Sequence, residues 1–278
     1  MSEINAGTPR RVLVQGDAGL SAFARMAPPF VPEFLSRDEL LHAVRSAPPS
    51  TVVLVEPFTG DEPVPAAWVR DLAAAAPLVP IVACTLFRPT HVAGITTLLA
   101  WGVTEIADAE FESTSASIRQ RLLDTHAKPF KLRVEQHLSR RVSQNGLTLL
   151  RAAAAVAVDG GRSVGLASAV GCSDRTVPGW CAREGLPAPR RLLAWMRALL
   201  AVALLEEHHR SIVQAAHFAG FASDHPLRRS LRELLGGDVP PRKRTLAGAM
   251  ELFNGELQEL RNRARRRTPV GGPGGSHD

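Results

Sequence analysis

Two similar stretches, SVGLASAVGCSDRTVPGWCAREGL (residues 163–186) and SIVQAAHFAGFASDHPLRRSLRELLG (residues 211–236), decide the fold of the second half of this chain. Each opens with a serine that can cap a helix, followed by a short apolar-faced segment, a turn with glycine, a second serine and an Arg-bearing segment. A helix, a turn of three or four residues and a second helix form a helix-turn-helix. The stretch PRRLLAWMRALLAVALLEEHH (residues 189–209) joins the copies and reads as one long helix.

The doubled pattern resembles the DNA-binding domain of the AraC/XylS family of bacterial transcription regulators, over residues 147–242. The residues that carry the resemblance are Leu166, Ala167, Gly171, Ser173, Arg175, Gly185, Leu186, Pro187, Arg190, Arg191, Leu192, Leu193, Arg197, Ala201, Leu204, Leu205, Ser211, Ile212, Ala216, Gly220, Phe221, Ser223, Arg229 and Gly236. The resemblance implies two recognition helices that enter successive major grooves on one face of the duplex. For paired motifs of this kind the grooves lie about 34 Å apart.

Side chains on these segments are the candidate DNA contacts. Arginine suits guanine edges, so we expect base contacts from the recognition helices, whereas phosphate contacts position the protein without specifying sequence. The candidates for base contact are Arg175, Thr176, His225, Arg228 and Arg229. The candidates for phosphate contact are Ser173, Arg183, Arg190, Arg191, Ser223, Arg232, Lys243 and Arg244.

Proline distinguishes the two recognition helices. If the first one starts at Ser173, Pro178 lies in its interior, where proline costs about 3 kcal/mol. The helix is then expected to kink, or to begin later with Thr176 as its cap. Pro226 lies within three residues of Ser223, where proline is tolerated. We therefore expect the second copy to read the sequence and the first to act mainly as a clamp.

Charge divides the chain in two. Residues 1–127 carry 9 Arg and Lys against 14 Asp and Glu, a net of −5, and residues 128–278 carry 24 against 13, a net of +11. Basic charge concentrated in one half is typical of proteins that bind a polyanion. A genome bias toward arginine is the alternative, but it does not account for the acidic first half.

The first half alternates strands with helices, which predicts a parallel sheet covered on both faces. Expected strands are 11–15, 30–34, 51–57, 80–85 and 103–107, and expected helices are 20–26, 38–46, 66–75, 90–101 and 113–125. Order and length resemble a response-regulator receiver domain with flavodoxin-like topology.

The receiver resemblance does not extend to the phosphorylation residues. Gly16 and Asp17 match the two magnesium acids, Glu56 matches the phosphoacceptor Asp, Thr85 matches the Thr, and Ala109 stands where the Lys belongs. The first domain is thus expected to be a degenerate receiver that is not phosphorylated. Glu56 is read either as a strand-end residue or as a permanent acidic mimic of phosphate.

The expected organisation is an α/β receiver-like domain (1–127), a linker helix and turn (128–146), an all-α domain with two helix-turn-helix motifs (147–242), and an amphipathic helix with a basic, disordered tail (243–278). In the tail, Leu246, Met250, Phe253, Leu257 and Leu260 form an apolar seam at heptad spacing. The seam either packs back on its own domain or forms a dimer coil.

No cofactor or metal site is expected. The three cysteines, Cys84, Cys172 and Cys181, lack zinc spacing and read as small apolar residues in a reducing cytoplasm. The chain has neither a signal-peptide pattern nor an apolar run long enough to cross a membrane, so a cytoplasmic location without membrane contact is expected.

These observations favour a sequence-specific DNA-binding transcriptional regulator. Double-stranded DNA, RNA polymerase, a second copy of the chain, and an unknown ligand or protein at the first domain are the expected partners. The alternative is an architectural protein that binds DNA without sequence preference. A third hypothesis, an enzyme that uses the strand ends of the first domain, lacks a catalytic constellation, so the chain is not expected to be an enzyme.

Overall fold

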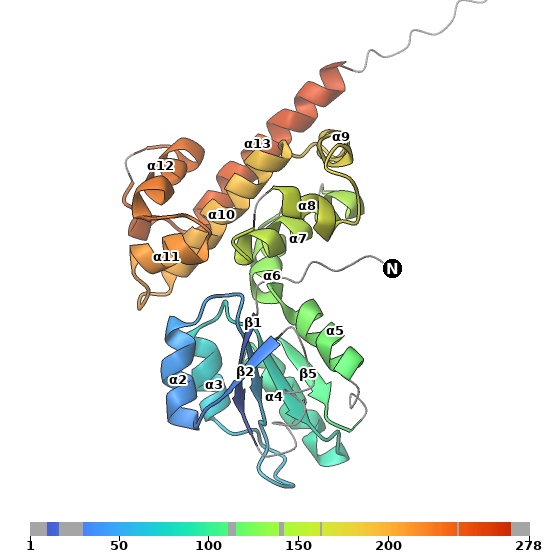
Figure 1. Ribbon diagram of the computed structural model, residues 1–278, viewed down its shortest axis with the longest axis vertical. Coiled ribbons are helices and arrows are strands. Elements are labelled where there is room, and N and C mark those ends of the chain that lie inside the picture. Colours follow the sequence, from blue (N-terminus) through green and yellow to red (C-terminus); the bar gives the residue numbers. More distant parts are fainter. Residues whose placement is uncertain are drawn as a thin grey trace, which may run out of the picture.

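A five-stranded parallel sheet forms the first part of the chain, in a computed structural model that describes residues 10–16, 30–110, 115–138, 142–161, 163–237 and 239–267 (Figure 1). Its order is β2-β1-β3-β4-β5, which is the order of flavodoxin-like folds. The strands are β1 (Arg10–Gln15), β2 (Phe30–Phe34), β3 (Val52–Val55), β4 (Ile81–Thr85) and β5 (Glu105–Asp108). All five expected strands are present.

Both faces of the sheet are covered, which explains why every residue of β3 and β4 is buried and why all of them but Thr85 are apolar. One face packs against helices α2 (Arg37–Ser46), α3 (Trp68–Ala75) and α4 (Val92–Ala100), and the other packs against α5 (Ser115–Thr125). A short 3-10 turn, η1 (Pro89–His91), precedes α4. The start of α2 is fixed by a capping box in which Ser36 and Glu39 exchange hydrogen bonds. The expected helix at 20–26 lies outside the described residues.

The second part of the chain is helical and is assembled around α10 (Pro189–Glu206) (Figure 1). Every residue of α10 from Leu199 to Leu205 is buried, as expected of a helix that is apolar all round. The surrounding helices are α6 (Lys128–His137), α7 (Gln144–Val158), α8 (Val164–Ala169), α9 (Thr176–Arg183), α11 (Ile212–Phe218), α12 (Asp224–Leu235) and α13 (Leu246–Arg267), with the 3-10 turn η2 (Pro241–Lys243) before α13.

Helix α6, which lies in the segment expected as a linker (128–146), belongs to this helical core. Phe130 and Val134 on α6 are buried in the same apolar cluster as α7 and α10, and α6 packs against both α7 and α13. The helix thus serves as a structural base of the second part.

The apolar seam of α13 packs back on its own chain. Leu246, Met250, Phe253 and Leu257 are buried in the helical core, and the Phe253 ring lies 5.3 Å from the Trp195 ring of α10. Of the two alternatives for the seam, a dimer coil and packing within the chain, the structure has the second. The residues expected to be disordered, 271–278, lie outside the described residues.

Among the polar contacts between the sheet part and the helical part, two lie close to the shorter helices. Asp159, at the end of α7, is bound by Arg10 of β1 at 2.9 Å and lies 2.8 Å from Nε2 of the buried His126. Arg210, before α11, donates from Nη1 to the carbonyl of Ala47 at the end of α2 at 3.0 Å. The contact at Asp159 lies just before the first helix pair, α8–α9. The contact at Arg210 lies just before the second helix pair, α11–α12.

Among the described residues, no helix combines the length and the apolar character needed to cross a membrane.

Candidate nucleic-acid interface

Helix α9 begins at Thr176, three residues after the expected start at Ser173. Arg175 occupies the N-cap position without a side-chain cap, so Thr176 is the first helical residue and not the cap. Pro178 is then the third residue of the helix, where its missing N–H would have had no partner. Of the two alternatives, a kink and a later start, the structure has the later start, which removes the cost of the proline.

The serines at the helix starts differ in what they do. Ser211 forms a capping box with Gln214, as its position predicts. Ser163 and Ser223 occupy N-cap positions but make no side-chain cap hydrogen bond, and Ser173 Oγ instead pairs with Thr176 Oγ1 at 2.8 Å. Of the four serines, only Ser211 makes the cap hydrogen bond that its position predicts. Ser173 and Ser223 are exposed.

Helices α9 and α12 each bury one apolar face and expose the other. Val177 and Cys181 are buried on α9, and Leu227, Leu231 and Leu235 are buried on α12. The two helices lie on either side of α10 (Figure 1). The five expected base-contact residues, Arg175, Thr176, His225, Arg228 and Arg229, are all exposed, and Arg228 is paired with Asp224 one turn earlier at 3.0 Å.

Burial aligns the two helices at an offset of 50 residues, because Val177 corresponds to Leu227 and Cys181 to Leu231. On this alignment Pro178 and Gly179 occupy the positions of Arg228 and Arg229. The exposed face of α9 therefore lacks arginine where α12 carries two.

The expected phosphate contacts divide into exposed and internally bound side chains. Arg183, Arg190, Arg232 and Lys243 are exposed. Arg191 instead makes a two-pronged ion pair with Glu256 of α13, at 2.6 and 2.7 Å. Arg244 donates to the carbonyls of Gly236, Gly237 and Val239. Both guanidinium groups are thus already engaged within the chain, a role that the sequence did not indicate.

The two helix pairs are held against each other at a glycine contact. Arg197 of α10 donates to the carbonyls of Gly160 and Gly161, before α8, and its guanidinium also lies beside Gly220, after α11. Gly220 has φ +77°, and a Cβ built there would lie 3.0 Å from Gly160 Cα. Because no side chain separates the two turns, they meet by backbone contact beside one arginine, in addition to the packing of both pairs on α10.

Sequence reasoning missed the buried polar groups at the junction of the two parts. Arg210 is fully buried and forms an ion pair with Glu207, and its guanidinium lies 5.3 Å from the Phe218 ring. Burial lowers the pKa of His126 despite the nearby Asp159 carboxylate. Burial alone would raise the pKa of Asp159, but His126 and Arg10 outweigh it and leave that pKa below its usual value.

The strand ends of the sheet carry the residues that correspond to a receiver site. Glu56 follows β3, Thr85 ends β4, and Ala109 follows Asp108 at the end of β5. Asp17 lies outside the described residues. In the part of the chain that the structure describes, no group of three or more His, Cys, Asp or Glu side chains is arranged to hold a metal ion.

None of the three cysteines forms a disulfide within the described part of the chain. Cys84 and Cys181 are buried, Cys172 is partly buried, and burial raises the pKa of Cys181 to about 11. A thiol with so high a pKa is not a nucleophile near neutral pH.

No family model matches this chain, and no curated protein matches its sequence. Among solved structures, the chain is similar to the xylose-binding transcription activator xylR, with 12% sequence identity and a TM-score of 0.34, over 89% of this chain and 71% of that chain. An identity and a score at this level assign neither a family nor a function. What the chain does is therefore inferred from its own residues.

Proposed function

We propose that this chain is a bacterial transcriptional regulator that binds double-stranded DNA through two helix-turn-helix motifs, α8–α9 and α11–α12. The exposed arginine-bearing face of α12 carries the proposal, because Arg228, Arg229 and Arg232 lie opposite the buried row of leucines. A helix that presents arginines over a firmly packed base suits the major groove, where arginine pairs with guanine edges.

The arrangement of the two motifs supports the same function. Both pack on α10 and meet at the contact of Gly160 with Gly220, so they would present their helices as one rigid unit. Reading two successive grooves needs such a fixed separation. Arg183, Arg190, Arg232 and Lys243 are exposed and remain the proposed phosphate contacts.

In this proposal the first domain is a degenerate receiver, which does not accept a phosphoryl group. Ala109 supplies no amine, and Glu56 stands at the acceptor position. Incubation with acetyl phosphate and Mg²⁺ is expected to leave the mass of the chain unchanged. A labile gain of one phosphoryl group within residues 10–125 would contradict this.

The chain is proposed not to be an enzyme, and RNA polymerase is its proposed partner at the promoter.

The function is tested by selecting bound sequences from a random DNA pool with the full chain. We expect one enriched site, with specific binding about 10³-fold or more tighter than nonspecific binding at the same salt concentration. Equal affinity for selected and random DNA would identify the alternative, an architectural protein without sequence preference.

A second test locates the activity. The fragment 128–278, which begins at the first residue of α6, is expected to shift duplex DNA with an affinity that falls steeply as salt rises. The acidic fragment 1–127 is expected not to bind. A 128–278 fragment that is folded by circular dichroism but does not shift DNA at low salt would contradict the proposal.

A further inference from the structure

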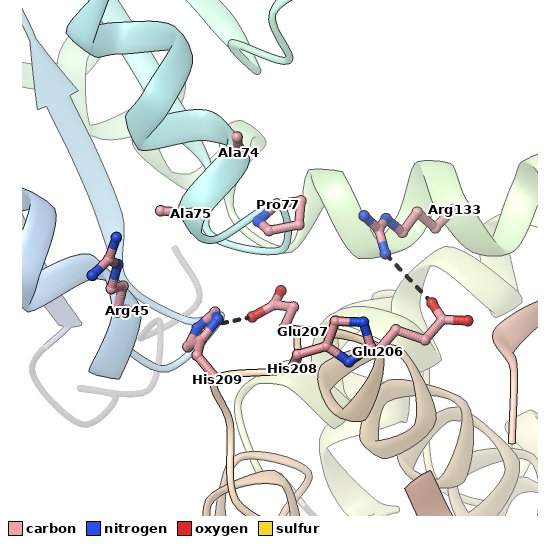
Figure 2. A pocket seen from close by; sticks show the side chains of 9 residues that line it. All are labelled: Arg45, Ala74, Ala75, Pro77, Arg133, Glu206, Glu207, His208 and His209. Carbon is pink, nitrogen blue, oxygen red and sulfur yellow. Dashed lines mark ion pairs between the residues drawn. The ribbon is translucent and has the colours of Figure 1, made fainter. Parts of the chain in front are cut away.

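A cavity of about 520 Å³ lies where the sheet part meets the helical part (Figure 2). Its lining comes from four places in the fold: the end of α2, the end of α3, the middle of α6, and the end of α10 with the turn that follows. The lining residues are Arg45, Ala74, Ala75, Pro77, Arg133, Glu206, Glu207, His208 and His209. Its volume lies within the range of small-molecule sites, which occur preferentially at domain interfaces.

A buried carboxylate in this cavity lacks a partner on one side. The side chain of Glu207 is 3% exposed, and its Oε2 is bound by Arg210 and lies 3.8 Å from His209 Nε2. Its Oε1 is buried and has no hydrogen-bond partner among the described residues. An acceptor left in this state is costly unless something donates to it, and Figure 2 shows the Glu207 carboxylate in the middle of the cavity.

A cation that forms no ion pair with any described residue lies on one side of this carboxylate (Figure 2). Arg45, at the end of α2, is exposed and forms no ion pair with any described residue, and His209 lies between it and Glu207 (Figure 2). On the other side, Arg133 is 3.9 Å from Glu206. The part of the lining that comes from the end of α3 consists of small apolar side chains, those of Ala74, Ala75 and Pro77. The cavity therefore presents a cationic end at Arg45 and, on the other side of His209, an acceptor on Glu207 that lacks a described donor (Figure 2).

We propose that this cavity binds a small carboxylic acid that carries an ammonium or hydroxyl group close to its carboxylate. The carboxylate would pair with Arg45 beside His209, and the ammonium or hydroxyl would donate to Oε1 of Glu207. Both α-amino acids and α-hydroxy acids have this pair of groups. A ligand with only one of the two groups would leave either Arg45 or Glu207 unmet.

The site is connected to the second helix pair. Glu207 holds Arg210, Arg210 donates to the Ala47 carbonyl at the end of α2, and Ser211 caps α11 immediately afterwards. A ligand bridging Arg45 and Glu207 would stabilise this same junction. Regulation of DNA binding by the ligand rests on the proposed function, whereas binding of the ligand does not.

The test measures thermal unfolding and titration calorimetry on the full chain without DNA. The probes are the twenty common L-amino acids in one arm and the sodium salts of lactate, glycerate, malate and tartrate in the other, with acetate and methylammonium as single-group controls. At least one two-group probe is expected to raise Tm by about 5 °C or more at 100-fold excess over its Kd. The arm that responds identifies ammonium or hydroxyl as the donor. Because no DNA is present, the result is independent of the DNA-binding proposal.

Variants assign the binding to this cavity. Arg45→Ala is expected to weaken binding about tenfold or more with little change in the Tm of the free chain, because Arg45 is exposed and forms no ion pair with any residue that the structure describes. Glu207→Gln is expected to weaken it similarly, and Arg70→Ala, on the exposed side of α3 outside the cavity, is expected to have no effect. The proposal is overturned if no probe binds, if acetate or methylammonium binds as tightly as the two-group probes, or if binding survives Arg45→Ala.

Discussion

At the scale of single residues, the contact of Gly220 with Gly160 sets the distance between the two helix pairs. Gly220→Ala would force a Cβ into left-handed backbone and place it 3.0 Å from Gly160 Cα and 3.2 Å from Arg197 Nη2. Gly171 also has a positive φ, +69°, but a Cβ there would meet nothing within 4 Å. We expect Gly171→Ala to cost about 1 kcal/mol and Gly220→Ala about 2–4 kcal/mol in urea unfolding. Equal losses for the two variants would contradict a tight contact.

The exposed arginines of α12 and α9 are expected to differ in what they recognise. Arg229→Ala should cost specific binding about 1–3 kcal/mol and relax the preferred base at one position. Arg175→Ala should weaken binding to all sequences about equally, because Arg175 stands at the N-cap position of α9 and no arginine follows on the exposed face of that helix until Arg183. Competition gel shifts with single-base variants of the selected site measure both effects. If the preferred base changes in Arg175→Ala and not in Arg229→Ala, α9 and not α12 reads the sequence, and the prediction is wrong.

At the scale of elements, the start of α9 shows how a local conflict is avoided. Because the helix begins at Thr176, Pro178 stands in its first turn. Pro178→Ala is then expected to change the free energy of unfolding by less than about 1 kcal/mol, whereas removal of an interior proline would stabilise the chain by about 3 kcal/mol. Ala182→Pro, at an exposed interior position of the same helix, is the matched control. It should destabilise the chain by about 3 kcal/mol in the same urea titration.

The elements themselves could largely be predicted from sequence. Apolar runs such as 52–55 and 81–85 predict strands because a buried parallel strand tolerates few polar residues. The helix starts were harder to predict. The hydroxyl of Ser173 pairs with that of Thr176, and the N-cap position of α9 falls at Arg175. Arg210 could not have been predicted as buried. Its partner is the backbone carbonyl of Ala47, 163 residues away. Every residue has a backbone carbonyl, so the sequence cannot show which one accepts this hydrogen bond.

At the scale of the whole molecule, His126 makes the junction between the two parts sensitive to pH. Burial lowers the pKa of His126 in the folded chain below the ordinary value of about 6.5. The unfolded chain therefore binds more protons in the window just below pH 6.5. Stability should be complete above that pH and should fall, by up to about 1.4 kcal/mol per pH unit, as the pH drops toward the folded pKa.

Urea titrations between pH 5 and 8 measure this dependence. His126→Gln should flatten the curve below pH 6.5 relative to the parent chain. His42→Gln, which changes an exposed histidine on α2, should leave the slope as it was. If His126→Gln follows the parent curve throughout, the junction does not respond through this imidazole.

The burial of α10 has a consequence for how such a chain can evolve. Each helix pair consists of helices of only 6 to 12 residues, and such short helices are marginal in water by themselves. Both pairs pack on the same helix, α10. A recombination that separated the two copies would leave α10 uncovered in one product and absent from the other. The repeats can diverge in sequence, as Pro178 and Arg228 have, but they can be inherited only together.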